Sequence, residues 1–445
     1  MPGSEPATKG NACRIALNIL VFLLIALLPF RIGPTAKILA CIAITLIAAF
    51  QWKAATGKDA FRMLKLYARS PVFLAVLCID CLALASIFFS PDQEYSVRVF
   101  LDEFLLNTCL FASVALYSST GSRCPLNWKK GLETANIIFL AGYLGLMLQW
   151  LLFPNHPLFM RADANIFMGS IPGIVFSFGN HSRVFHGIHH VSLFLGLMIA
   201  FWSNMPERNS WKNILFIFVN FATLISTTRR AASLASLAGM LFALKKQKKD
   251  SMLLLITVTA LIAGIFMAVF LAGASKYFVR ENWQLMFRGN IEQARKLGGS
   301  IPLRMSTYRE FSREITRHPF TPQGIGKKLI KEYHRDLVKR AGLQHGHNTL
   351  LNFAFYMGIQ GAIALAMLVF VQARLFWKAL QDAGSIHDRQ LMLTALTFLI
   401  IFWGTNMFTD GFRHGSATLY WLFTAISTGR ALMISQQSVQ NGQMA

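Results

Sequence analysis

The chain has 445 residues, of which 54% are hydrophobic and 14% are charged, and its mean hydropathy is +0.46. These values exclude a water-soluble globular protein. The formal net charge of +23 is typical either of nucleic-acid binding or of the cytoplasmic loops of a membrane protein, so the positions of the cations must decide between them.

Apolar runs long enough to cross about 30 Å of hydrocarbon recur along the chain. Backbone groups in lipid must be paired within a helix or in a closed barrel, and continuous apolar runs without two-residue alternation indicate helices. The first run follows Lys9 and Arg14 and has no A-x-A-like cleavage site after it, so we interpret it as a retained helix. The predicted spans are 15–30, 36–51, 71–90, 99–117, 132–153, 187–203, 211–227, 231–244, 251–272, 348–374, 390–408 and 416–433.

Lys and Arg residues are concentrated in alternate connections between these spans. The basic connections are 52–70, 118–131, 204–210, 245–250 and 375–389. The positive-inside rule therefore places them, and both termini, in the cytoplasm.

Two long segments, 154–186 and 273–346, then lie outside. The second holds fifteen Lys/Arg against six Asp/Glu, a net charge of +9. Because this basic segment faces outward, nucleic acid is not an expected partner. Within it, helices are predicted over 305–317 and 327–340, separated by the turn-forming run 318–326.

The predicted fold is thus an all-α integral membrane protein of about twelve spans with one large, partly helical outer loop. Its predicted parts are helices one to nine in 1–272, the basic loop 273–346, helices ten to twelve in 347–434, and a disordered cytoplasmic tail, 435–445. The six cysteines all precede residue 125, so they suggest neither a disulfide framework outside nor a zinc site.

Arg229 and Arg230 stand at the predicted outer mouth of the eighth span. Both oppose the positive-inside rule, and the helix N-terminus already presents partial positive charge. An anion would remove both penalties, so the pair predicts a phosphate site. The alternative is a pair of arginines that extend to lipid headgroups.

His347 marks the re-entry of the chain into the membrane after the basic loop. Next to a helix N-terminus an imidazole tends to stay neutral, which suits it to accept a proton. The alternatives are a histidine that only caps an interfacial turn, and a metal ligand acting with His345, His334 or the group His186, His189 and His190. The scarcity of outer carboxylates argues against a metal, and that histidine group is interpreted as interfacial.

Two further polar residues stand out. Arg304 opens the amphipathic part of the loop and could supply a third cation, the alternative being a solvated surface charge. Asp80 lies in the middle of the third span, where a carboxylate is costly, and is interpreted as functional or paired.

Taken in order along the chain, these residues resemble the O-antigen ligase family. The matching features are Arg230 with Leu234, His347 with Gly358, and Arg304 with Tyr308 ahead of the turn Gln323-Gly324-Ile325-Gly326. The span count and the single large outer loop also match, so the resemblance covers essentially the whole chain. Tyr308 stands where tryptophan is commoner in that family.

The resemblance implies a GT-C-like membrane glycosyltransferase of a Gram-negative inner membrane. Such a ligase moves O-antigen from undecaprenyl pyrophosphate to a hydroxyl of lipid A–core at the periplasmic face. Arg230, Arg304 and His347 are the implied catalytic residues. Arg229, Arg309, His345 and Asn348 are candidates for binding the pyrophosphate or an acceptor phosphate, and Leu234 and Gly358 are structural. Because arginines can neutralise the leaving group, no metal or other cofactor is expected.

Other functions remain open at this stage. An O-antigen polymerase would use the same donor, and a ligase that attaches glycans to protein is a further variant. A transporter or flippase would show inverted repeats and broken helices in corresponding halves, and the sequence has neither. The glycan, the acceptor sugar and the oligomeric state are not encoded in any recognisable pattern.

Overall fold

A computed structural model describes most of the chain, and the residues it describes are 6–30, 33–121, 124–152, 188–205, 211–227, 230–246, 292, 300–341, 346–409, 412 and 414–444. These residues form helices joined by turns and contain no β-strand. Every predicted span except 251–272 falls in helical structure, although two of them, 99–117 and 348–374, extend over more than one element. The span 251–272 lies outside the described residues, as does the segment 154–186.

The first part of the bundle contains the helices up to residue 152. They are α1 (Pro6–Leu27), α2 (Pro34–Thr56), the 3₁₀ turn η1 (Gly57–Asp59), α3 (Ala60–Ala68), α4 (Pro71–Ile87), α5 (Gln93–Val99), the π-helical turn η2 (Phe100–Leu105), α6 (Leu106–Ser118) and α7 (Trp128–Leu152).

The second part runs from residue 188 to the end of the described chain. Its helices are α9 (Ile188–Ser203), α10 (Trp211–Ser226), α11 (Arg230–Lys245), α15 (Ser300–Arg317), α16 (Lys327–Tyr333), α17 (Arg335–Ala341), α18 (Thr349–Met357), α19 (Ile359–Asp382), α20 (Ile386–Asn406) and α21 (His414–Met444).

Local sequence explains where several of these helices begin and end. Ser70 caps α4 by accepting a hydrogen bond from the backbone N–H of Phe73 at 3.3 Å, and Pro71 fits the first helical position, where no N–H is needed. Gly57, with φ +51°, ends α2 in a conformation that favours glycine. α2 therefore turns into the short helix α3 instead of continuing.

The outward faces of several helices are apolar. On α2, Leu39, Leu46 and Phe50 are exposed, whereas Cys41 and Ala48 on the opposite side are buried. Three helices are long and apolar enough to cross a membrane, Pro34–Thr56, Gln93–Ser118 and Ile359–Asp382, and five shorter apolar helices accompany them among the described residues. A face of this kind is stable next to hydrocarbon and unfavourable next to water.

α20 and α21 form the centre of the bundle and are buried along most of their length up to Ala431. α21 packs on α6, where the carbonyl oxygen of Ala115 lies so close to Gly429 that no side chain fits there. α21 continues to Met444, so the predicted disordered tail is helical in the structure as far as that residue. Once a helix is nucleated, each further residue adds a hydrogen bond at little cost, and the polar tail contains no proline to stop it.

The predicted tenth span is not one helix. Gly358, with φ +76°, separates α18 from α19. The two predicted helices of the basic loop are present as α15 and as the pair α16 and α17, which break at His334.

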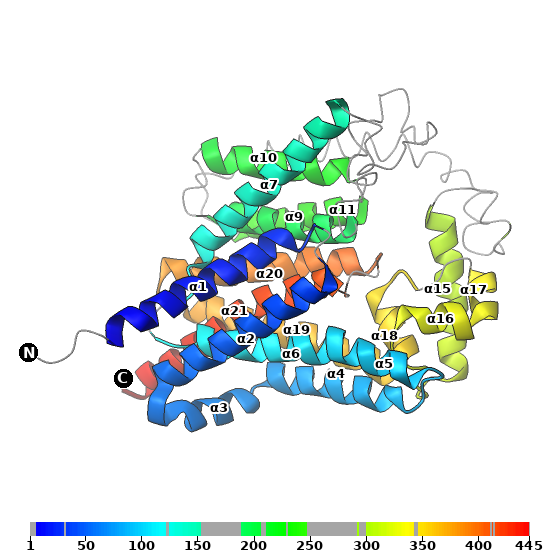
Figure 1. Cartoon of the computed structure of the whole chain (residues 1–445), viewed down its shortest axis with the longest axis horizontal. Coiled ribbons are helices and arrows are strands. Elements are labelled where there is room, and N and C mark those ends of the chain that lie inside the picture. Colours follow the sequence, from blue (N-terminus) through cyan, green and yellow to red (C-terminus); the bar gives the residue numbers. More distant parts are fainter. Residues whose placement is uncertain are drawn as a thin grey trace, which may run out of the picture.

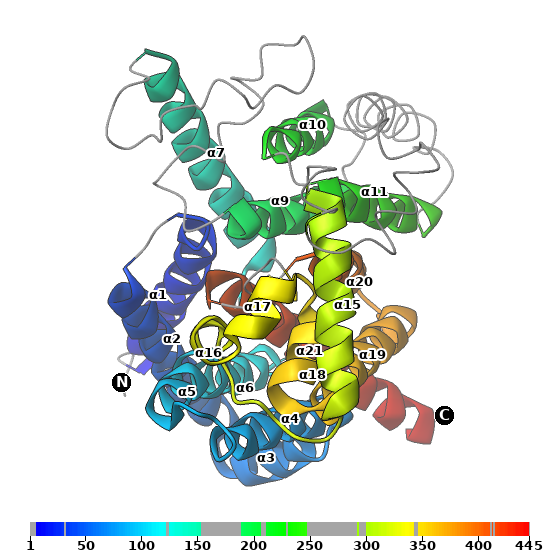
Figure 2. The same ribbon diagram turned by 90° about the vertical axis from the view of Figure 1, so that its right-hand side faces the viewer.

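The two ends of the bundle differ. Both termini lie at one end, on the left in Figure 1, and α15, α16 and α17 lie at the opposite end. α15 runs across that end of the bundle, as the view in Figure 2 shows. We call it the α15 end.

Candidate active site

The His347 turn lies at the α15 end, immediately before α18. Among the described residues, His347 is the only non-glycine residue with positive φ, at +46°. Asn352 of α18 holds the residue before His347, because its Oδ1 accepts a hydrogen bond from the Gly346 N–H at 2.8 Å. Residues that sit in this backbone region away from glycine are frequent at functional sites, because the surrounding contacts must hold them there.

Asn348, not His347, caps α18. Its Oδ1 accepts a hydrogen bond from the Leu351 N–H at 3.0 Å, and its Nδ2 donates to the carbonyl oxygen of Met407 at 2.9 Å. Both ends of the Asn348 amide therefore contact protein, and each end keeps one further donor or acceptor position. His347 precedes the helix by two residues, so its imidazole is placed by the turn and not by the helix.

The end of α20 and the turn that follows it hold the start of α18 in place. Besides the Asn348 bond to Met407, Thr349 Oγ1 donates to Asn406 Oδ1 at 3.1 Å and lies 3.3 Å from the carbonyl oxygen of Thr409. The sequence analysis missed these residues. The run Asn406–Thr409 at the end of an apolar span was the available signal, but its partners are distant in sequence.

Tyr308 joins α15 to the His347 turn. Its hydroxyl donates to the carbonyl oxygen of His347 at 3.1 Å and lies 3.5 Å from that of Met407. Arg304 stands one helical turn earlier on the same face of α15. The amphipathic helix predicted from the loop sequence therefore brings Tyr308 to the His347 turn, with Arg304 one helical turn away along α15.

Arg304 is half-buried, and burial lowers the pKa of its guanidinium, although Tyr308 nearby opposes that change. Among the described residues, no carboxylate lies within ion-pairing distance of Arg304. A guanidinium remains charged even so, because its ordinary pKa is far above neutrality. Arg304 is therefore a cation held partly out of water, with no anion beside it in the part of the chain that the structure describes.

The other arginines of the same loop are paired differently. Glu310 is buried and lies 2.9 Å from Arg313 Nη1, with Arg309 Nε and Arg340 Nε each at 3.5 Å. Glu314 pairs with Arg317 at 3.4 Å. Arg309, a predicted ligand of phosphate, thus already shares a carboxylate with two other arginines.

The junction of α10 and α11 reaches the same end of the bundle. Thr227 Oγ1 lies 3.3 Å from Ser192 Oγ near the start of α9, and His190 Nδ1 lies 2.5 Å from Ser416 Oγ at the start of α21. α11 begins at Arg230. These contacts place the start of α11 at the end that carries the α20–α21 turn and the His347 turn.

Several predicted residues lie outside what the structure describes or away from this site. Arg229 and His345 fall outside the described residues, as do the Arg230 side chain and His186. Leu234 is exposed on α11, one turn after Arg230. Asp80 lies on α4, and no group of three or more His, Cys, Asp or Glu side chains that could hold a metal occurs among the described residues.

The predicted turn between α15 and α16 is docked on the break at Gly358. The carbonyl oxygen of Pro319 accepts from the Ile359 N–H at 2.8 Å, and Gln323 N–H donates to the Tyr356 carbonyl oxygen at 3.1 Å. Gln360 Nε2 adds a bond to the Phe320 carbonyl oxygen at 3.0 Å. The two motifs that the sequence analysis treated separately, the glycine-rich turn and Gly358, therefore contact each other.

Comparison with known families gives one match. Residues 214–366 match the family model described as Wzy_C, O-antigen ligase. The matched segment contains Arg230, Arg304, His347 and Gly358. No curated protein matches the chain.

Proposed function

We propose that the chain is an O-antigen ligase, the family whose model its segment 214–366 matches, and that it transfers an O-antigen glycan from undecaprenyl pyrophosphate to a hydroxyl of lipid A–core. Its apolar helices and its family make it a membrane protein. The donor, the acceptor and the roles of individual residues are the proposed part.

Arg304 supplies the observation that carries this proposal. Its guanidinium is half-buried, has no carboxylate beside it among the described residues, and stands one turn before the tyrosine that bonds to the His347 turn. A cation kept in such a place is stabilised when an anionic ligand arrives, and a pyrophosphate is such a ligand.

In the proposed reaction, an acceptor hydroxyl oxygen attacks the anomeric carbon of the glycan. The bond from that carbon to the pyrophosphate oxygen breaks, and its electron pair stays on undecaprenyl pyrophosphate. His347 accepts the proton of the attacking hydroxyl. A single displacement of this kind inverts the anomeric centre.

Arginines are proposed to stabilise the leaving pyrophosphate. Arg229, Arg230 and Arg304 would neutralise the charge that develops on it, in the role that a metal ion plays elsewhere. Arg309 and His345 would bind pyrophosphate or a phosphate of the acceptor. Asn348 would act by holding the His347 turn, given its two contacts with protein.

The proposed topology has twelve spans, both termini in the cytoplasm, and the loop that contains α15, α16 and α17 in the periplasm of a Gram-negative cell. The positive-inside pattern supports it, and so does the position of both termini at the end of the bundle opposite α15 (Figure 1). The Arg304 side of the site would then face the leaflet in which the donor and the acceptor meet.

A transfer assay with the purified full chain tests the proposal. It contains undecaprenyl-pyrophosphate-linked glycan, lipid A–core and EDTA, and compares the wild type with His347→Ala and Arg230→Ala. The matched control is Arg317→Ala, an exposed arginine of α15 in a surface ion pair. We expect transfer by the wild type in EDTA, loss in the two site variants, and a rate within about twofold of wild type in the control.

Other outcomes would overturn the proposal. Lengthening of the glycan on its carrier would identify a polymerase. Movement of the carrier across the bilayer without transfer would identify a transporter. Transfer that requires a divalent cation would overturn the arginine-based mechanism.

A further inference from the structure

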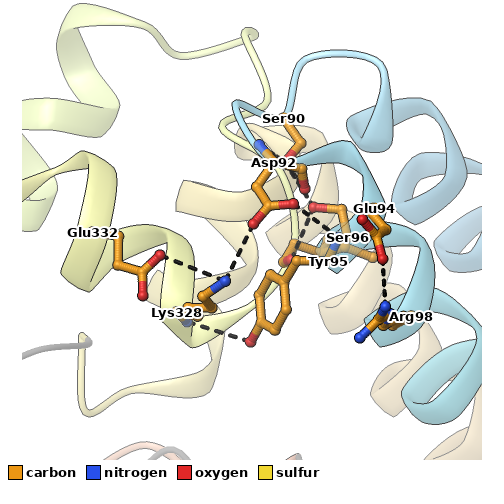
Figure 3. Close-up of polar contacts among 9 residues, drawn as sticks. Ser90, Asp92, Glu94, Tyr95, Ser96, Arg98, Lys328 and Glu332 are labelled. Atoms are coloured by element: carbon orange, nitrogen blue, oxygen red, sulfur yellow. Dashed lines mark hydrogen bonds and ion pairs between the residues drawn. The ribbon is translucent and has the colours of Figure 1, made fainter.

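A polar segment, residues 90–96, comprises the turn after α4 and the first residues of α5. It receives the start of α16, although the two segments are more than two hundred residues apart in sequence. The turn lies outside the segment 214–366 that matches the O-antigen ligase family. Figure 3 shows the side chains of the turn and of α16 pointing toward one another.

The backbone of the α15–α16 turn fits closely against this surface. Gly324 and Gly326 have φ of +84° and +122°, where other residues are strained. A Cβ at Gly324 would lie 2.7 Å from Ser90, and one at Gly326 would lie 2.4 Å from the Tyr95 ring. The two glycines therefore permit both the conformation and the close approach.

Directional contacts specify the docking. Ser96 Oγ lies 3.2 Å from the Ile325 carbonyl oxygen, to which it can donate, and 2.7 Å from Ser90 Oγ. Tyr95 Oη accepts from the Lys328 N–H at 3.3 Å. The contacts use backbone groups of the glycine-rich turn and of α16, so they set the position of the main chain.

Asp92 serves both helices at once. Its Oδ1 accepts from the Tyr95 N–H at 3.0 Å and so caps α5, while its Oδ2 lies 3.3 Å from Lys328 Nζ on α16. The hydrogen bond from the Tyr95 N–H and the nearby Lys328 ammonium keep the pKa of Asp92 low, so the carboxylate stays charged. One carboxylate thus couples the start of α5 to α16.

The continuation of the same helix contacts the other half of the site. Phe104 in η2 packs against Phe353 of α18, with ring centroids 6.2 Å apart. α18 follows the His347 turn directly, and α16 follows α15 through the docked turn. The segment 90–104 therefore holds both the helix next to His347 and the helix that continues from Arg304 and Tyr308.

We propose that Asp92, Tyr95 and Ser96 are positioning residues for glycan transfer, which fix α16 so that Arg304 and Tyr308 stay against the His347 turn. This inference rests on the proposed function. Tyr308 bonds to the His347 carbonyl oxygen at 3.1 Å, so a small shift of α15 breaks that contact. Displacements of about 1 Å around a reacting centre can reduce a rate by about a hundredfold.

The test uses the full chain in lipid nanodiscs and compares Tyr95→Phe and Lys328→Met with wild type. Tyr95→Phe removes the hydroxyl that accepts from Lys328 and leaves the ring. Lys328→Arg restores a cation opposite Asp92. The matched control is Arg98→Gln on the same helix α5, which removes an exposed ion pair with Glu94.

We expect kcat for transfer to fall about tenfold in Tyr95→Phe and Lys328→Met, while KM for the lipid-linked donor changes less than about twofold. Lys328→Arg is expected to recover most of kcat, and Arg98→Gln to match wild type. Hydrogen exchange gives a second measure, because amides of 304–317 and 327–333 should exchange faster in the two impaired variants, with α7 unchanged.

The outcomes separate this inference from the proposed function. If the wild type transfers glycan and both variants keep its kcat, the positioning role is overturned and the proposed function stands. If the wild type transfers no glycan, the proposed function is overturned and the positioning role with it. A fall in kcat accompanied by faster exchange throughout the chain would indicate general destabilisation and would also overturn the positioning role.

Discussion

Each end of the bundle holds an arginine at least partly out of water, and the surroundings of the two arginines differ. Near the termini, Arg430 on α21 is 1% exposed. Its Nε and Nη2 donate to the two carboxylate oxygens of Asp388 at 2.6 and 2.8 Å, and its Nη1 donates to the Gly121 carbonyl oxygen at 3.3 Å. At the α15 end, Arg304 is half-buried, and no carboxylate among the described residues faces it.

This difference distinguishes a structural charge from one that is available to a ligand. In a buried ion pair, the attraction between the charges and the further hydrogen bonds offset the cost of removing both groups from water. Removal of one partner leaves a charge that nothing compensates. Arg304 has no such partner among the described residues. A bound anion can satisfy its charge, so we expect its substitution to affect function more than stability.

The largest expected effect is at the terminal end. Asp388→Ala leaves the Arg430 guanidinium buried without its carboxylate and should lower the free energy of unfolding by about 3–5 kcal/mol. Reversible unfolding in mixed micelles measures it. The double variant Asp388→Ala with Arg430→Met should recover part of the loss, and a single variant as stable as wild type would contradict the structural role of the pair.

Arg304→Met should produce the opposite pattern. We expect kcat for transfer to fall by about 10²–10³, the usual cost of removing one charge-stabilising donor, with the unfolding midpoint unchanged or higher. Transfer and unfolding are measured on the same preparation, with Arg317→Ala as the control. If Arg304→Met loses as much stability as Asp388→Ala, the contrast between the two arginines is wrong.

A smaller effect is expected at Asn348. Asn348→Ala removes the cap of α18 and should cost about 1 kcal/mol of stability, together with a fall in transfer because the His347 turn loosens. Asn348→Asp keeps the capping oxygen but loses the amide that donates to Met407. If transfer depends on the Met407 contact, Asn348→Asp will keep the stability of wild type but transfer glycan more slowly. Equal transfer in wild type and Asn348→Asp would assign the role of Asn348 to capping alone.

The smallest expected effect depends on pH. Burial lowers the pKa of His334 from its ordinary value of 6.5, with Glu314 acting in the opposite direction, and the ring packs edge-on against Phe355 of α18. The unfolded chain therefore binds a proton more readily than the folded chain. The stability from neutral His334 is present above about pH 6.5 and is lost as the pH falls through the folded pKa. Unfolding midpoints measured on both sides of that range should shift less in His334→Gln than in wild type.

Much of the fold could be predicted from local patterns. Apolar runs located the helices, because a helix in lipid satisfies its own backbone and needs only a continuous apolar sequence. Turn-forming residues located the break after Arg317. The break at Gly358 was not predicted as a helix end, because a single glycine in an apolar run is compatible with either outcome.

The candidate site was predictable in part. The sequence by itself determined that this is a helical membrane protein with a basic loop, and it singled out Arg304 and His347, because the cost of a charge or a polar group near a helix end depends on neighbouring residues only. Tyr308 was expected from the family resemblance. Tertiary structure alone decided which cations have a carboxylate partner within the described part of the chain, as Arg309 and Arg430 do, and which has none there, as with Arg304. It also brought Met407, Asp92 and Tyr95 to the elements of the site. Their partners lie between 59 and 236 residues away along the chain, and no local pattern specifies which polar groups meet once the helices have packed.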